Sequence, residues 1–225
     1  PWSFLHISKP EVDLPKGTDP YAAEVYAKGA ENLQREIDEG ILMRDAQPCY
    51  YVYRLRMGEH VQTGLVFTGS VADYDTNRIR KHEYTRPQKE DDRVRQVDTL
   101  NAQTGPVFLT YRHNATIDAL VAEITAAAPE VDITADDGVQ HALWPVCDEA
   151  AINTITDTFD AMDAIYIADG HHRSAAGSRV AAMRKEANPN HTGDESYNYL
   201  PYVIFLADQL INPDYNRVTH DLYGL

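Results

Sequence analysis

The sequence predicts an α+β fold in which hairpins and helices interleave along one chain. Hydrophobic residues make up 43% of the chain and charged residues 24%, which is typical of a folded globular protein and unlike a disordered one. At 225 residues, the chain is long enough to bury a substantial core. The apparent strands and helices lack the regular alternation of a doubly wound sheet. We therefore expect mixed sheets with hairpins and packed helices.

The first 71 residues predict a helix and a hairpin. An apolar series at helical spacing follows Asp19-Pro20 and predicts a capped helix, with proline in its first turn, that closes near Gly40. Two stretches rich in aromatic and β-branched residues come next, at 49–57 and 61–71. Because Gly58-Glu59 separates them, we expect an antiparallel hairpin.

The region 73–105 is densely charged and predicts one helix. Pro87 suits the first turn of a helix that runs to about Ala102, and Thr85 suits its N-cap. Basic and acidic side chains alternate along this helix, a pattern most typical of a solvated face with pairs four residues apart. A short apolar strand follows at 106–111.

The middle of the chain predicts a second hairpin between two helices. Apolar residues have helical spacing in 116–128 and again in 148–162. Between these helices, Asp136-Asp137-Gly138 separates two strand-like stretches, 131–134 and 139–146.

The last predicted elements surround the most polar turn of the sequence. A buried strand at 164–168 leads directly into Asp169-Gly170-His171-His172-Arg173, and a small-residue helix is expected at 174–187. One more strand is expected at 199–207. Without a repeat or a Gly/Ser-rich linker, we expect a single region over 1–225, with a division into 1–105 and 106–225 as the alternative.

The composition of the chain limits which partners it can bind and where in the cell we expect it. The net charge of −15 disfavours attraction to nucleic acid or anionic lipid over the whole surface. No stretch approaches the roughly 18 to 20 apolar residues that cross a bilayer. Cys49 and Cys147 are far apart, form no CxxC motif and are too few for a disulfide framework, so we expect a cytoplasmic protein. The start at Pro1 lacks an initiator Met, and we expect the chain to be part of a longer polypeptide.

The strand-to-helix turn at 165–178 has the composition of an anion site. Backbone N–H groups at a helix N-terminus favour an anion, and Gly170 permits close approach of a ligand. Arg173 offers a planar fork for phosphate oxygens, and His171 or His172 can donate or carry a proton. Asp169 would hold Mg²⁺ or accept a hydroxyl proton. These groups together predict phosphoryl transfer.

Two other interpretations of this turn compete with phosphate binding. The turn would be purely structural if Asp169 capped the helix and the histidines were packed. A zinc site is less favoured, because adjacent His171 and His172 point in different directions and no further ligand follows at zinc spacing. The glycines are too scattered for a Walker loop, which excludes a standard P-loop kinase.

A second polar group precedes the helix that begins at Pro87. A carboxylate, an imidazole and a hydroxyl meet there in His82-Glu83-Tyr84-Thr85. We assign His82, Thr85 and Arg86 to substrate binding, beside the carboxylate of Glu83. If this segment faces Asp169, the two segments form a site that neither could form alone.

Four segments resemble the DUF1015 family: IADGHHRSAA, KHEYTRPQKEDDR from Lys81, NAQTGPVFLTY from Asn101 and NPDYNRV from Asn212. The DGHHR segment alone also resembles the wider ParB/sulfiredoxin-like superfamily, which includes free-serine kinases. In those kinases this turn holds the nucleotide phosphates, and a Glu of a His-Glu segment activates the serine hydroxyl. The resemblance therefore implies a ParB/sulfiredoxin-like core with large insertions.

Residue by residue, the resemblance implies a phosphate-binding turn at Asp169, Gly170, His171, His172 and Arg173, to which we add Ser174, and a general base at Glu83. It implies a kinase that uses ATP or ADP with Mg²⁺, held by Asp169, to phosphorylate free L-serine. His172 would assist catalysis. The alternatives are a ParB-like nucleotide-binding regulator or nucleic-acid-associated protein without kinase turnover, and an assembly scaffold whose site has decayed.

Overall fold

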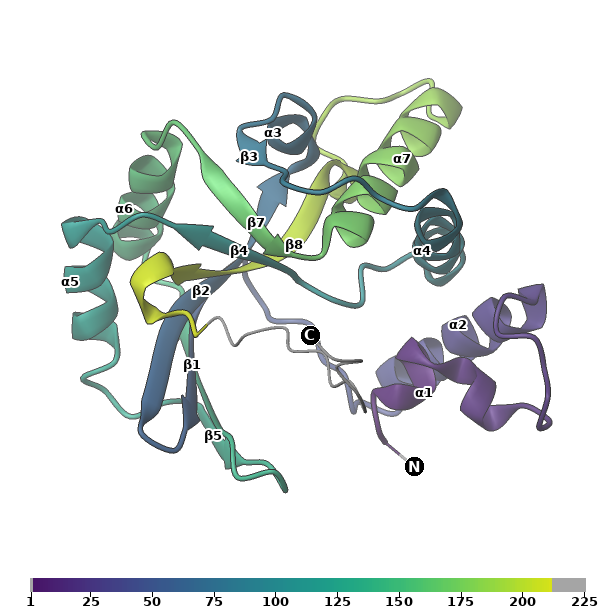
Figure 1. The fold of residues 1–225 in the computed structure, drawn as a ribbon, viewed down its shortest axis with the longest axis horizontal. Coiled ribbons are helices and arrows are strands. Elements are labelled where there is room, and N and C mark those ends of the chain that lie inside the picture. Colours follow the sequence, from purple (N-terminus) through teal and green to yellow (C-terminus); the bar gives the residue numbers. More distant parts are fainter. Residues whose placement is uncertain (1, 212–225) are drawn as a thin grey trace, which may run out of the picture.

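One mixed sheet organises the fold (Figure 1), in a computed structural model that describes residues 2–211. Eight strands form this sheet in the order β3-β7-β4-β8-β2-β1-β6-β5. The α+β class is confirmed, with a single sheet. The strands are β1 (Tyr50–Met57), β2 (His60–Ser70), β3 (Ile79–Arg80), β4 (Val107–Tyr111), β5 (Val131–Thr134), β6 (Gln140–Val146), β7 (Ile165–Asp169) and β8 (Tyr199–Leu206).

Both predicted hairpins are present and set the register of one half of the sheet. β1 pairs antiparallel with β2, and β5 pairs antiparallel with β6. β1 also pairs with β6, which joins the two hairpins edge to edge. In the other half, β4 runs parallel to β8 and β3 runs parallel to β7. The two-residue strand β3 was not predicted.

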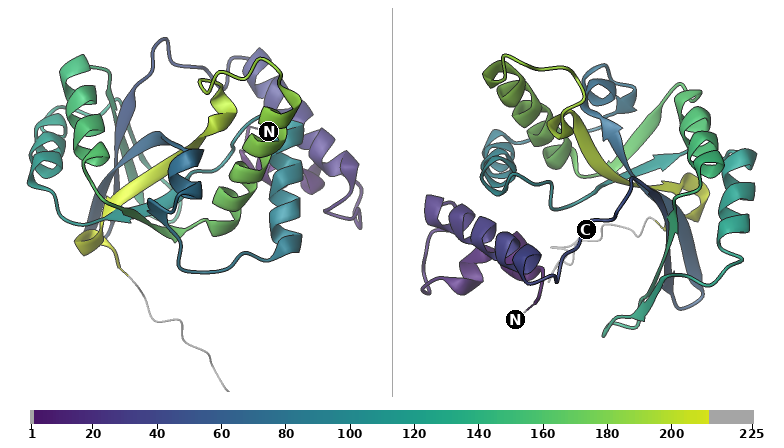
Figure 2. Two further views of the ribbon diagram at one scale, coloured as in Figure 1. Left: turned by 90° about the horizontal axis from the view of Figure 1, so that it is seen from above. Right: turned by 180° about the vertical axis from the view of Figure 1, so that it is seen from behind.

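Helices lie on the sheet and beside it (Figures 1 and 2). The first three helical segments form what we call the N-terminal helical unit, residues 5–38; it packs against α4, which packs against α7. The helices are α1 (Leu5–Ser8), α2 (Ala23–Asp38), α3 (Val71–Asp75), α4 (Pro87–Leu100), α5 (Ala115–Ile124), α6 (Glu149–Asp160) and α7 (His171–Ala187), with 3-10 turns η1 (Pro10–Asp13), η2 (Ser196–Asn198) and η3 (Ala207–Gln209).

The main hydrophobic core lies between the sheet and the helices that pack near the two ends of the sheet. Alternate residues of a strand point to the same side, so Leu200 and Tyr202 of β8 share one face. A Cβ on Gly177 of α7 would overlap the side chain of Leu200, which shows how closely this helix approaches the sheet. The ring of Tyr202 packs at a tilt against Phe67, which in turn contacts Phe159 of α6. Helices α6 and α7 therefore cover the same face of the sheet.

The N-terminal helix differs from its prediction in its start and in its buried face. α2 begins at Ala23 and leaves Pro20 outside, because Asp19 caps a turn that precedes the helix. Of the apolar series that predicted the helix, Val25 is 2% exposed and Ile37 is 48% exposed, whereas Glu36 is 2% exposed. α2 packs on α4 and on the helical segments that precede it, so these helices determine which of its side chains are buried.

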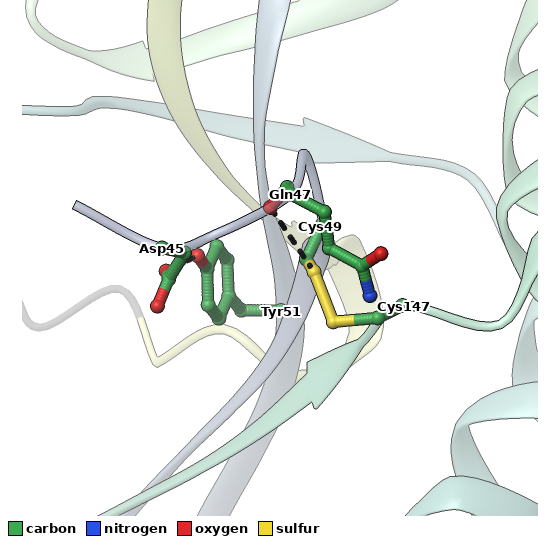
Figure 3. The surroundings of a disulfide bond; sticks show 5 residues. All are labelled: Asp45, Gln47, Cys49, Tyr51 and Cys147. Carbon is green, nitrogen blue, oxygen red and sulfur yellow. Dashed lines mark hydrogen bonds between the residues drawn. A yellow bond between two sulfur atoms is a disulfide. The ribbon is translucent and has the colours of Figure 1, made fainter.

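A disulfide joins the two cysteines (Figure 3), contrary to the expectation drawn from their separation in sequence. Tyr50 of β1 pairs with Val146 of β6. Cys49 comes directly before Tyr50 and Cys147 directly after Val146, so the antiparallel register places them opposite each other. Strand pairing, which spacing cannot show, brings the two thiols together.

Location and domain division stay predictions. Within residues 2–211, no helix combines the length and apolar character needed to cross a membrane. A cytoplasmic location and the division at 105/106 are not tested by this finding. Strands from both sides of that division pair within the one sheet.

Candidate functional site

The polar turn joins β7 to α7 and contains one left-handed residue. β7 ends at Asp169 and α7 begins at His171, three residues before the predicted start at Ser174. Gly170 lies between them with φ of +102°, a conformation that favours glycine. A Cβ there would also lie 3.1 Å from a guanidinium nitrogen of Arg173. The two histidines and Arg173 thus occupy the first turn of a long helix.

Arg173 connects the ends of two neighbouring strands. Its guanidinium donates to the Asp169 carboxylate at 2.7 Å and to the carbonyl oxygen of Pro106. Because β4 pairs antiparallel with β7, the chain entering β4 lies beside the end of β7. The Asp169 side chain is still 75% exposed. The predicted phosphate fork therefore already has a carboxylate partner, which holds it in position.

His171 is buried and contacts the His82-Glu83 segment with both ring nitrogens. It is 3% exposed, and its Nε2 accepts the backbone N–H of His82 at 3.4 Å. Burial lowers the pKa of His171, and His82 lowers it further. The neutral ring then carries its proton on Nδ1, which lies 3.4 Å from Oε1 of Glu83. His171 is thus placed to orient the Glu83 carboxylate.

His172 holds the same segment at a second point. Its Nε2 accepts the backbone N–H of Arg86 at 3.0 Å. The short strand β3 explains why these segments meet: it runs parallel to β7, with Arg80 beside Tyr166, so both chains leave the sheet at the same end. The residues that follow β3 are thereby carried to the N-terminus of α7.

Six of the predicted site residues line one cleft of about 600 Å³. That volume falls within the usual range for ligand sites. Four other predicted residues do not line it. The Thr85 hydroxyl donates to Glu90 at 2.7 Å instead of capping α4, and the buried Ser174 hydroxyl donates to the Gly170 carbonyl at 3.3 Å. Arg86 contacts His172 through its backbone N–H, and His82 contacts His171 through its backbone N–H and through an edge-to-face ring contact. The lining residues are Glu83, Asp169, Gly170, His171, His172 and Arg173.

The whole chain, residues 1–225, matches a family model described as "Protein of unknown function (DUF1015)". The chain belongs to the DUF1015 family. Comparison with curated proteins and with solved structures gives no significant match. Two segments that carry the resemblance, 81–93 and 167–176, come together at the cleft of this DUF1015 protein. The NPDYNRV segment, 212–218, lies outside the described residues.

Two further walls of the cleft were not predicted. The N-terminal helical unit of the DUF1015 protein contributes Lys9 and Tyr26, and α4 contributes Lys89 and Arg93. The Tyr26 hydroxyl donates to Asp92 of α4 at 2.7 Å and fixes the two walls to each other. The spacing of Lys89 and Arg93, one helical turn, is the sequence signal that could have indicated a shared face.

Glu90 and Asp91 of α4 pair with α7, whereas Asp92 lies 3.9 Å from Arg93 of its own helix. Arg179 of α7 donates to Glu90 and to Asp91, at 2.8 Å in each case. Hydrogen bonds from the Thr85 hydroxyl and from Arg179 lower the pKa of Glu90. The acidic side of α4 is thus used for packing on α7, while its basic side lines the cleft.

The donor set fits Mg²⁺ better than zinc. Within the described part of this DUF1015 protein, no group of three or more His, Cys, Asp or Glu side chains could hold a metal. Zinc requires such a set. Mg²⁺ bound with a nucleotide needs only one or two carboxylates, since phosphates and water supply the other ligands. The Asp169 carboxylate is 75% exposed, and although its Oδ2 accepts from Arg173 it could supply one such ligand.

Proposed function

We propose that this DUF1015 protein is a small-molecule kinase that transfers a phosphoryl group from ATP or ADP to the hydroxyl of free L-serine, giving O-phosphoserine. One observation carries the proposal: Glu83 and the Asp169–Arg173 turn line the same cleft, although helices and strands separate them in sequence. The resemblance to free-serine kinases, with a ParB/sulfiredoxin-like core, supplies the reaction and the acceptor.

The first turn of α7 would bind the nucleotide phosphates. The backbone N–H groups of this turn and the dipole of a 17-residue helix favour an anion at this position. Gly170 has no side chain to crowd the Arg173 guanidinium, which lies over it and supplies a fixed positive charge. His172 lines the cleft beside them. Asp169 would hold Mg²⁺, which offsets the charge of the phosphate oxygens during transfer.

Glu83 would act as the general base. Its side chain is 52% exposed in the cleft, and the Nδ1–H of His171 faces its carboxylate. The serine hydroxyl would give its proton to Glu83 as its oxygen forms a bond to the terminal phosphorus. The bond from that phosphorus to the bridging oxygen breaks at the same time, and ADP, or AMP when ADP is the donor, leaves. His171 acts through Glu83 and is a positioning residue.

Formation of O-phosphoserine by the purified full-length protein tests this function. With ATP or ADP, Mg²⁺ and L-serine, we expect a phosphorus NMR signal from O-phosphoserine. Glu83→Gln should lower kcat by roughly 10²- to 10⁴-fold, the usual contribution of a general base. Asp169→Asn should abolish turnover without loss of fold by circular dichroism. Glu59→Gln, in the exposed turn between β1 and β2, is the matched control.

Each outcome decides between the candidate functions. Unchanged turnover in Asp169→Asn would remove Asp169 from the mechanism. Nucleotide binding without serine-dependent turnover in the wild type would favour the regulator over the kinase. In that case, DNA binding with a steep salt dependence would identify the nucleic-acid-associated form of that alternative.

A further inference from the structure

One wall of the cleft presents basic side chains that the proposed phosphate site does not use. Lys89, Arg93 and Gln96 are spaced by about one helical turn, lie on one face of α4 and line the cleft. Lys9, at the end of α1, lines the same cleft from the N-terminal helical unit. These cations belong to other elements than the phosphate-binding turn of β7 and α7.

The contacts of these cations leave positive charge available. Lys89 forms no ion pair with any residue in 2–211. The strongest contact of Arg93 is to the neutral amide oxygen of Gln96, at 2.6 Å, and its Nε lies 3.9 Å from Asp92. The Asp92 carboxylate in turn accepts a hydrogen bond from Tyr26. Although the chain has a net charge of −15, the positive charge of Lys89 is therefore available to an anionic ligand in the cleft.

Carboxylates on the same wall limit which anion would fit. Glu11 lies 3.6 Å from Lys9, and Asp92 lies beside Arg93. A compact group of both signs is therefore a better match than a polyphosphate, whose repeated negative charges these two carboxylates would repel. An α-amino acid carries one carboxylate and one ammonium group. Its charge pattern is complementary to this wall.

The position of Lys89 relative to Glu83, the proposed base, also fits an α-amino acid. Glu83 is followed after a few residues by α4, and Lys89 lies in the first turn of that helix. An acceptor whose hydroxyl faces Glu83 would have its carboxylate near this turn while the nucleotide phosphates occupy the first turn of α7. We propose that Lys89 and Arg93, with Lys9, form a subsite that binds the carboxylate of the amino-acid acceptor. This inference rests on the proposed kinase function.

The test compares L-serine with L-serinamide, in which a neutral amide replaces the carboxylate. In the wild type, we expect KM for serine to be at least about tenfold lower than KM for serinamide, the equivalent of one charge-assisted contact. Lys89→Met and Arg93→Met should each raise KM for serine about tenfold, with KM for serinamide and for the nucleotide unchanged. Lys185→Met, at the exposed far end of α7, is the matched control and should change none of these constants.

The outcomes separate this inference from the kinase function. Lys89 is exposed, so its substitution should leave the melting temperature and circular dichroism unchanged. Wild-type turnover with an unchanged ratio of the two KM values in both variants would overturn the subsite alone. A raised nucleotide KM with unchanged serine KM would assign the cations to the phosphates and overturn it as well. If the wild type does not phosphorylate serine, the kinase function fails and this inference fails with it.

Discussion

Each end of α7 carries a polar network that contains a histidine and a carboxylate. The two networks differ in how accessible their carboxylates are to a ligand. Beyond its C-terminus, Glu195 accepts the backbone N–H groups of Thr192 at 2.7 Å and Gly193 at 3.0 Å. His191 Nδ1 lies 2.9 Å from the Tyr197 hydroxyl and 3.0 Å from Glu195. Every partner in this network comes from residues 188–198, so the loop satisfies its own polar groups.

The network at the N-terminus of α7 joins distant segments and remains open. His171 and His172 bind the backbone of residues 82–86, far away in sequence. The carboxylates of Glu83 and Asp169 keep 52% and 75% of their side-chain surface exposed. A histidine next to a carboxylate is thus no sign of a site by itself. What distinguishes the cleft is that its carboxylates are held in place and still accessible to a ligand.

Among the tests of this contrast, the largest expected effect comes from removing the histidine that holds Glu83. His171→Ala takes away both the acceptor for the His82 N–H and the group that faces the Glu83 carboxylate. Because small misplacements of a reacting group slow catalysis strongly, kcat for serine should fall roughly 100-fold. His191→Ala, in the closed network, should leave kcat unchanged. Steady-state kinetics on both variants measures the contrast.

A conservative variant separates positioning from a general loss of structure. In His171→Asn, the side-chain amide places an N–H near the position of Nδ1. It should recover part of kcat while KM for the nucleotide stays unchanged. Equal losses in the Ala and Asn variants, or an equal loss in His191→Ala, would contradict a positioning role for His171.

The disulfide offers a stabilising element away from the cleft. It joins β1 to β6, whereas the cleft lies at the ends of β7 and β4, across several strands of the sheet. Its reduction should lower the free energy of unfolding by about 2–4 kcal/mol, since the bond closes a long loop, and should leave kcat unchanged. Denaturation with and without a reductant measures this change. In the double variant Cys49→Ser/Cys147→Ser, the reductant should have no effect on stability. A fall in the kcat of the wild type on reduction would contradict the separation of the disulfide from the cleft.

Local patterns predicted much of this fold and the more compact half of the site. The hairpins follow from alternation of residue types around Gly58 and Gly138, where both glycines adopt positive φ. The DGHHR turn could be placed at a strand-to-helix junction because an apolar run ends there and small residues follow. These features depend on residues close together in sequence, so periodicity and turn chemistry reveal them.

The other half of the site depends on pairings between distant residues. The position of Glu83 follows from β3, whose two residues are too few for any periodic signal. The wall that contains Lys9 follows from the packing of one helical unit on α4, through the bond from Tyr26 to Asp92. Cys49 and Cys147 likewise meet through strand register. Spacing along one sequence contains no information about such contacts.

Lowering the pH should produce the smallest effect of these tests on the folded protein. It should disrupt the two networks at different pH values. Burial lowers the folded-state pKa of His171 below its usual 6.5, so the unfolded chain binds more protons just below that pH. Stability therefore falls as pH drops from 6.5 toward the folded-state value, and the protonated Nε2 can no longer accept the His82 N–H. Hydrogen bonds from Thr192 and Gly193 lower the pKa of Glu195 to about 2 from 4.5, so its contribution to stability is full above pH 4.5 and is lost progressively as pH falls from 4.5 through about 2.

Backbone amide NMR signals followed from pH 7 downward can test this order. The His82 amide should shift first, in the window below 6.5, while the Thr192 and Gly193 amides hold their positions below pH 4.5. In Glu195→Gln, the Thr192 amide should shift at neutral pH, with a melting temperature changed by a few degrees at most and kcat unchanged. A midpoint near 4.5 for the Thr192 amide would show that the loop does not hold Glu195 as described. The contrast between a closed network and an open one would then rest on the cleft alone.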